Sequence, residues 1–121
     1  MVFHIVLYQP EIPPNTGNVI RLCANSGMTL HLIEPLGFEL DDARLRRAGL
    51  DYHEFAEVRS WGDFETFRAS VHPDRILACS TRGGRTYSEV RYREGDALVF
   101  GPETRGLPQS FLEQFPDECR L

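Results

Sequence analysis

The stretch whose residues most suggest chemistry runs from Leu98 to Pro108 (LVFGPETRGLP). The apolar run 97–100 predicts a buried strand, and the turn after it carries a carboxylate, Glu103, and a guanidinium, Arg105. Ligand sites of α/β proteins form at the carboxyl ends of strands, where such a turn would lie. GPETRG has the glycine spacing of a P-loop but lacks the Lys-Ser/Thr pair that completes one. By itself, the pattern fits an ordinary strand-to-helix loop equally well.

A second candidate stretch, residues 10–21, lies near the amino end. Its prolines predict a rigid loop, because proline fixes φ and lacks an N–H donor. Asn15 or Thr16 is expected to cap a helix over 17–26. Arg21 would lie on the polar face of that helix, where its planar guanidinium suits a phosphate. The alternative is a plain surface arginine.

The elements that must position these stretches follow from hydrophobic periodicity. Buried strands are predicted over 3–8, 29–33, 75–80 and 97–100, and edge strands over 52–58 and 90–93. Helices are predicted over 17–26, with Val19, Leu22 and Cys23 buried, and over 41–49, 61–69 and 108–115. The alternation predicts one α/β domain over 1–121, with a mostly parallel sheet and flanking helices.

Composition sets limits on the class of protein. Hydrophobic residues make up 41% and charged residues 26% of the chain, as in ordinary globular proteins. We expect no membrane span and no signal peptide, and therefore a cytoplasmic protein. The spacing of cysteines and histidines predicts neither a disulfide framework nor a metal site.

The charge pattern leaves nucleic-acid binding open. The net charge of −5 argues weakly against it, but a local basic patch can bind nucleic acid on an acidic protein. Every basic residue is arginine, whose planar fork suits phosphate. A biased genome composition is the alternative explanation.

Together the two stretches carry a family resemblance. N-x-G-N-x-x-R at Asn15–Arg21 and F-G-P-E-x-x-G-L-P at Phe100–Pro108 resemble motifs of the SPOUT superfamily of RNA 2′-O-ribose methyltransferases. Tyr8–Ala24 and Leu45–Phe55 strengthen the resemblance, which covers essentially the whole chain. It is greatest to the branch that methylates the ribose of the wobble nucleotide, C34 or U34, of certain leucine tRNAs. The resemblance implies S-adenosyl-L-methionine as methyl donor and the tRNA anticodon stem-loop as partner.

The same resemblance implies an α/β trefoil knot and an obligate homodimer. The knot is an exception to the rule that chains are unknotted. The third motif of the family, an Asn-Ser segment opening a helix, would come after Leu121, where this chain stops. We therefore expect this 121-residue form to lack the knot segment and to bind S-adenosylmethionine weakly or not at all.

Site residues are carried over by position. The resemblance implies catalytic roles for Arg21, Asn15 and Glu103. Arg21 would hold the target phosphate and orient the hydroxyl, because a guanidinium with a pKa above about 12 is a poor general base. The implied cofactor-binding residues are Leu77, Cys79, Thr81, Gly101, Pro102, Glu103, Gly106 and Leu107, and the candidate RNA contacts are Arg44, Arg46, Arg47, Arg82 and Arg85.

A rival interpretation remains open at this point. The chain would then be a non-catalytic or inactive relative of the same fold that binds RNA or a nucleotide without turnover. Methyl transfer from labelled S-adenosylmethionine to tRNA distinguishes the two. A flavodoxin-like nucleotide-binding domain is a third option, which nothing in residues 10–21 favours.

Overall fold

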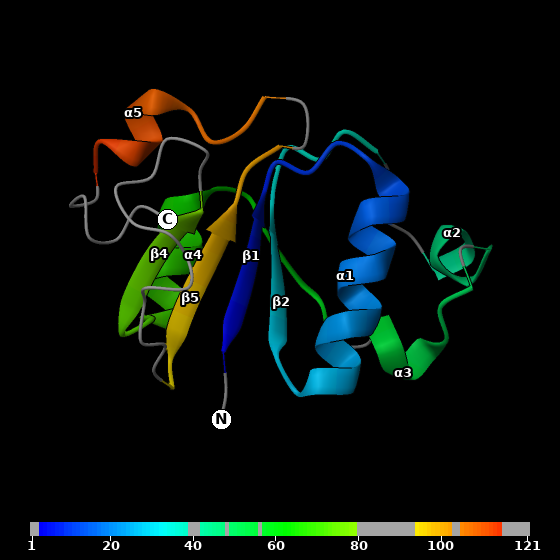
Figure 1. Cartoon of the computed structure of the whole chain (residues 1–121). Coiled ribbons are helices and arrows are strands. Elements are labelled where there is room, and N and C mark those ends of the chain that lie inside the picture. Colours follow the sequence, from blue (N-terminus) through cyan, green and yellow to red (C-terminus); the bar gives the residue numbers. More distant parts are fainter. Residues whose placement is uncertain are drawn as a thin grey trace.

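Five parallel strands form the centre of the molecule (Figure 1). The computed structural model describes residues 3–38, 42–47, 49–55, 57–79, 94–102 and 105–114. The strands are β1 (His4–Tyr8), β2 (Thr29–Ile33), β3 (Arg59–Trp61), β4 (Arg75–Cys79) and β5 (Asp96–Phe100). They pair in the order β3-β2-β1-β5-β4, and every pairing among them is parallel. The predicted α/β class is confirmed, with β1 at the centre of the sheet.

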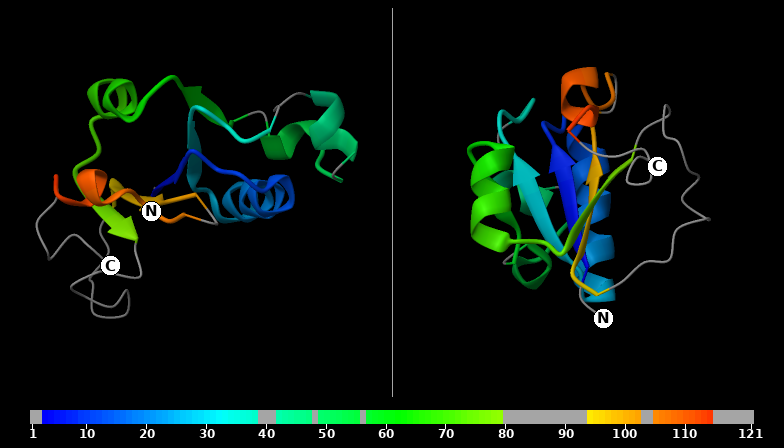
Figure 2. Two further views of the ribbon diagram at one scale, coloured as in Figure 1. Left: turned by 90° about the horizontal axis from the view of Figure 1, so that it is seen from above. Right: turned by 90° about the vertical axis from the view of Figure 1, so that its left-hand side faces the viewer.

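Helices lie on both faces of this sheet (Figure 2). The described helices are α1 (Pro13–Ser26), α2 (Asp42–Arg47), α3 (Tyr52–Phe55), α4 (Phe64–Val71) and α5 (Gln109–Leu112). Helix α1 covers one face and α4 the opposite face, while α5 lies near the carboxyl ends of the strands. The layers explain why the strands are apolar on both sides, as buried parallel strands are.

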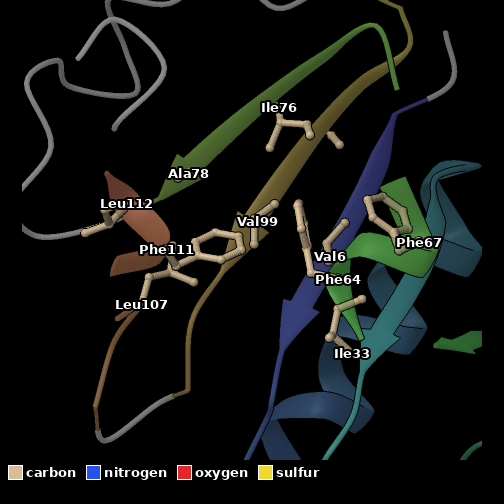
Figure 3. Packing of buried hydrophobic residues seen from close by; sticks show 11 residues of the cluster. Val6, Ile33, Phe64, Phe67, Ile76, Ala78, Val99, Leu107, Phe111 and Leu112 are labelled. Carbon is tan, nitrogen blue, oxygen red and sulfur yellow. The ribbon is translucent and has the colours of Figure 1, made fainter. Parts of the chain in front are cut away.

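Two apolar cores fill the spaces between these layers. On the α4 side, Phe64 and Phe67 pack with side chains of four strands and with Phe111 of α5 (Figure 3). On the α1 side, Ile20 and Cys23 pack against β1, β2 and Leu50. Phe64 and Phe67, in the helix predicted over 61–69, are therefore core residues. Trp61 belongs to β3 and packs beside that core.

The sheet has a switch point between β1 and β5. These neighbouring strands pair from His4↔Ala97 to Leu7↔Phe100, so they end together. After β1 the chain enters α1 on one face, and after β5 it enters α5, whose Phe111 packs in the core on the other face. Loops that leave neighbouring parallel strands toward opposite faces open a crevice at the carboxyl edge of the sheet. Both candidate stretches therefore lie at the place where such folds bind ligands.

The register of β4 and β5 is held at their amino ends by an ion pair. Arg75 and Asp96 are directly paired residues. Nε of Arg75 donates to Oδ1 of Asp96 at 3.2 Å and Nη2 donates to Oδ2 at 2.8 Å. The carboxylate is buried, and this two-bond geometry is the strong form of such pairs. It fixes the two strands whose opposite ends carry the candidate cofactor site.

The start of α1 corrects the prediction of a helix over 17–26. The helix begins at Pro13, and its N-cap Ile12 makes no side-chain capping bond. Prolines suit the first helical turn, since the N–H they lack has no partner there anyway. Neither Asn15 nor Thr16 is the cap. The buried face is centred on Ile20 and Cys23, while Leu22, predicted to be buried, is exposed.

The predicted strand over 52–58 is wrong. Residues 52–55 form the short helix α3, and the edge strand follows as Arg59–Trp61. The helix starts there because the Asp51 side chain accepts from the N–H of Glu54, and the Glu54 side chain accepts from the N–H of Asp51, each at 3.0 Å. This reciprocal arrangement is a capping box. The aromatic content of the segment pointed to a strand, but the local caps decide its structure.

Other elements agree with the sequence to within a few residues. The strands predicted over 3–8, 29–33, 75–80 and 97–100 correspond to β1, β2, β4 and β5. Helix α4 begins three residues after the predicted 61, because Asp63 caps it through the N–H of Thr66 at 2.7 Å. The helices predicted over 41–49 and 108–115 appear as the shorter α2 and α5. The predicted strand over 90–93 lies outside the described residues.

Candidate functional site

The loop after β5 closes on itself. A Cβ atom on Gly101 would overlap the backbone of Gly106 and Leu107. The N–H groups of Arg105 and Gly106 both donate to the carbonyl of Pro102, at 3.2 and 2.7 Å. Gly106 has φ +69°, a conformation that favours glycine. The two glycines thus allow the loop to close tightly.

The loop after β1 meets this closed loop. Nε of Arg105 lies 3.4 Å from Oε2 of Glu11. The Glu11 segment is also tied to the loop after β2, because the N–H of Gly37 donates to the carbonyl of Pro10 at 2.9 Å. A Cβ atom on Gly37 would lie 3.0 Å from the Cα of Glu11. Three loops therefore pack together at the carboxyl edge of the sheet.

The end of β4 lies next to the end of β5. Leu77 pairs with Leu98, and Cys79 pairs with Phe100. The Leu77 side chain is fully buried, so only its backbone is placed to contact a ligand. Burial raises the pKa of the Cys79 thiol to about 11, which argues against a thiolate nucleophile. Thr81 and Glu103 lie outside the described residues.

Asn15 faces the β5 loop across an apolar cavity. The cavity, of about 350 Å³, is lined by Asn15 and Gly101 together with Ile5, Leu7, Val19, Leu22, Cys23, Met28 and Phe100. Two of its large apolar side chains are exposed, Leu22 at 57% and Phe100 at 40%. The structure therefore brings Asn15 and Gly101 together, as expected. It also leaves an apolar surface on the α1 side of the sheet.

Arg21 lies on a different side of α1. Its Nε donates to Oε2 of Glu54 at 3.1 Å, and its Nη2 donates to the carbonyl of Gly49 at 2.9 Å. These partners belong to the segment that joins α2 to α3 and to α3 itself. The expectation that Asn15 and Glu103 stabilise Arg21 stays a prediction: Asn15 lines the cavity beside the β5 loop, and Glu103 lies outside the described residues.

Glu54 is the residue that the sequence analysis missed. Its signal was present as D-x-x-E at Asp51–Glu54, the spacing of a capping box. Recognising that signal would have placed a carboxylate at the start of a helix. It would not have shown that this carboxylate lies beside Arg21, which comes from a distant part of the sequence.

Three of the candidate RNA contacts, Arg44, Arg46 and Arg47, belong to α2, which leads into the turn at Gly49 that binds Arg21. Arg46 and Arg47 are both exposed, and the N–H of Gly49 donates to the carbonyl of Arg46 at 3.0 Å. Nε of Arg47 lies 3.4 Å from the carbonyl of Ala43 in the same helix. Arg44 belongs to α2, but its side chain, like Arg82 and Arg85, lies outside the described part of the chain. Arg21, Arg46 and Arg47 are thus three solvent-exposed arginines on the adjoining segments α1 and α2.

Within the ranges that the structure describes, no group of three or more histidine, cysteine, aspartate or glutamate side chains is placed to hold a metal ion. No helix in those ranges is long and apolar enough to cross a membrane.

Known proteins resemble this chain along nearly all of its length. The tRNA (cytidine(34)-2′-O)-methyltransferase of Aeromonas hydrophila is 65% identical over 117 residues, which are 97% of this chain and 75% of that protein. A solved structure described as giving structural insights into the 2-OH methylation of C/U34 on tRNA is 49% identical. It has a TM-score of 0.85, with 95% of this chain and 76% of that one covered.

A more distant structure shares the fold. The SpoU methyltransferase AviRb of Streptomyces viridochromogenes, solved in complex with the cofactor AdoMet, is 15% identical with a TM-score of 0.74, covering 92% of this chain and 44% of that one. Residues 2–121 match the model of the SpoU rRNA Methylase family. With that match and the identity to the Aeromonas protein, the chain belongs to the SpoU methylase family.

Proposed function

We propose that this protein transfers a methyl group from S-adenosyl-L-methionine to the ribose 2′-hydroxyl of nucleotide 34, the wobble position, of leucine tRNAs. This is a TrmL-type activity. The observation that carries the proposal is the 65% identity, over 97% of the chain, to a tRNA (cytidine(34)-2′-O)-methyltransferase. The family is named for rRNA methylation, so family membership alone would leave the choice of RNA open.

The methyl donor would be held by the closed loop after β5 and the end of β4. Gly101, Pro102, Gly106 and Leu107 are suited to present backbone groups, because the loop closes with no side chain at Gly101. Leu77 and Cys79 would contribute backbone groups from the neighbouring strand. This arrangement fits a nucleoside that is recognised by main-chain hydrogen bonds. The roles of Thr81 and Glu103 in the same site remain proposals from the resemblance.

When bound, S-adenosylmethionine would supply a methyl group on a positively charged sulfur. The new bond from the ribose 2′-oxygen to this methyl carbon would form as the carbon–sulfur bond breaks, with S-adenosylhomocysteine as the leaving group and the hydroxyl proton released to water. The contribution of the protein is mainly to bring the hydroxyl within about 3 Å of that carbon in line with the breaking bond. Asn15, which lines the cavity beside Gly101, would shape this end of the site.

Arg21 would bind a phosphate of the tRNA backbone and thereby orient the target ribose. Its side chain is 46% exposed, and three of its five N–H groups have no partner within the described residues. A guanidinium binds phosphate through two parallel hydrogen bonds. Arg46 and Arg47 would extend the contact along the anticodon stem-loop, together with Arg44, Arg82 and Arg85.

We also propose that the protein is a homodimer that works in the cytoplasm, where its tRNA substrate is modified. The exposed apolar side chains of Leu22 and Phe100, around the cavity on the α1 side of the sheet, support the dimer. Exposed apolar patches of this kind mark interaction surfaces.

Methyl transfer from labelled S-adenosylmethionine to purified leucine tRNA, followed by analysis of the methylated nucleoside, tests the function. We expect one 2′-O-methyl group at position 34 with the parent protein. Arg21→Ala should nearly abolish transfer while leaving the affinity for S-adenosylmethionine similar. Methylation of rRNA in place of tRNA would contradict the substrate, and turnover of Arg21→Ala equal to the parent would contradict the role of Arg21.

A further inference from the structure

The guanidinium of Arg21 is held along one edge only. Nε and Nη2 point the same way along that edge, and both donate to acceptors of the protein: Oε2 of Glu54 at 3.1 Å and the carbonyl of Gly49 at 2.9 Å. The other edge, which Nη1 and Nη2 form, has no acceptor within the described residues. A group held in this way presents a fixed pair of donors to an anion that approaches from solvent.

Both acceptors are themselves fixed by the backbone. Glu54 belongs to the capping box of α3: its Oε1 accepts from the N–H of Asp51, and its own N–H donates to Oδ1 of Asp51, each at 3.0 Å. Gly49 has φ +88°, in a turn closed by bonds from the N–H groups of Gly49 and Leu50 to the end of α2. One carboxylate thus uses one oxygen to cap a helix and the other to hold Arg21.

Stability does not account for this arrangement. The side chains are 46% exposed for Arg21 and 18% exposed for Glu54, and exposed ion pairs typically contribute less than about 1 kcal/mol to folding. A carboxylate beside a phosphate-binding arginine also repels the phosphate, so it does not raise affinity for RNA. What the pair does supply is direction, because it removes the rotational freedom of a long side chain before the ligand arrives.

We propose that Glu54 is a positioning residue for methyl transfer. Its carboxylate holds the edge of the Arg21 guanidinium that Nε and Nη2 form, so that the edge formed by Nη1 and Nη2 meets the phosphate next to the target ribose. This inference rests on the proposed function, since it needs Arg21 to bind the tRNA backbone. Glu54 does not touch the substrate. Its effect should therefore appear in turnover and should depend on Arg21.

The test compares Glu54→Gln with Glu57→Gln in the full-length protein. Glutamine keeps one carbonyl oxygen, which can still cap α3, but the oxygen that holds Arg21 is replaced by an amide NH₂, a donor. Glu57 lies three residues further along and is exposed, so its variant makes the same change of charge away from Arg21. Both variants are also made in an Arg21→Ala background.

We expect Glu54→Gln to lower kcat by on the order of tenfold to a hundredfold, with the Kd for tRNA unchanged or tighter. Glu57→Gln should keep kcat within about twofold of the parent. In the Arg21→Ala background, Glu54→Gln should add no further loss, since coupled residues do not act additively. NMR of arginine side chains should show the Nε–H signal of Arg21 protected from exchange in the parent and in Glu57→Gln, but not in Glu54→Gln.

Two results would overturn the proposal while leaving the proposed function intact. One is an unchanged kcat for Glu54→Gln, and the other is an equal loss with and without Arg21, which would indicate a merely structural role. Failure of the proposed function looks different, because the parent protein itself would then transfer no methyl group to tRNA. That outcome would overturn the positioning role as well.

Discussion

The backbone of Leu107 occupies the space that a side chain on Gly101 would need. Five residues lie between Gly101 and Leu107 in the sequence, yet the two residues touch in space. The contact brings the end of β5 against the segment that leads into α5. Any residue other than glycine at position 101 would therefore force the loop to move.

Gly101→Ala should open this loop. The added methyl group overlaps backbone atoms, which cannot rotate away, and overpacking of this kind costs about 1–3 kcal/mol of folding free energy. We expect the affinity for S-adenosylmethionine, measured by calorimetry, to fall by at least about tenfold, the equivalent of 1.4 kcal/mol. Gly62→Ala is the matched control, because a Cβ at Gly62 meets nothing within 4 Å. Equal cofactor affinity in the two variants would contradict the role of the loop.

Much of the fold could be predicted from the sequence because its signals are local. Short apolar runs bounded by glycine and proline predicted four of the described strands, with ends close to the observed ones. The two candidate stretches were both placed next to predicted strands, and Glu11 and Arg105 join the loops that follow those strands. In each case a few neighbouring residues decide the conformation.

The rest depended on contacts between distant segments. Aromatic residues in 52–58 favoured a strand, but the capping box of Asp51 and Glu54 makes a helix. The resemblance implied catalytic roles for both Asn15 and Arg21. Helix α1 turns Asn15 toward Gly101 and Arg21 toward α3. Which face of a helix meets which neighbour follows from packing, and no local pattern in residues 10–26 specifies it.

Arg46→Ala should weaken tRNA binding in a way that salt reveals. A lost phosphate contact releases one fewer counterion, so the slope of log K against log salt should become shallower by about one. The loss should be similar for different tRNAs, since phosphate contacts carry no sequence information. Arg68→Ala, on α4 across the sheet, is the control and should keep the parent slope. An unchanged slope for Arg46→Ala would indicate that α2 is not part of the RNA-binding surface.

Leu22→Glu should dissociate the proposed homodimer. Leu22 is 57% exposed on the apolar side of α1, and a carboxylate buried in an interface without a partner is strongly unfavourable. Light scattering coupled to gel filtration should show half the parent mass. Ser70→Glu, an exposed position on α4, adds the same charge to the opposite face and should leave the mass unchanged. A Leu22→Glu protein that stays dimeric would place the interface elsewhere.

A partly buried chain of three nitrogen-bearing side chains, with His31 fully buried at its centre, crosses β1, β2 and β3. The indole Nε1 of Trp61 donates to Nδ1 of His31 at 3.0 Å. Since Nδ1 accepts, neutral His31 carries its proton on Nε2, which lies 3.0 Å from Nδ1 of His4. Burial, with His4 and Arg59 nearby, lowers the pKa of His31 to about 4. Burial also lowers the pKa of His4, which lies near Arg59 and Asp74.

This chain should make the protein less stable in mild acid. The unfolded chain protonates His31 below its ordinary pKa of about 6.5, whereas the folded protein resists protonation down to about pH 4. Stability is therefore complete above pH 6.5 and is lost as the pH falls toward 4. For His31 alone, we expect a loss of about 2 kcal/mol between pH 8 and pH 5, measured by urea unfolding. His4 adds to this loss in the same direction.

Two histidine-to-glutamine variants distinguish the contribution of His31 to the loss of stability in acid from that of the carboxylates, which also begin to titrate near pH 5. His31→Gln should be less stable than the parent at pH 8 but should lose about 2 kcal/mol less between pH 8 and pH 5, because its side chain binds no proton. His53→Gln changes an exposed histidine of α3 and should keep the parent dependence on pH. If His31→Gln loses as much stability in acid as the parent does, the partly buried chain is not the source of the acid sensitivity.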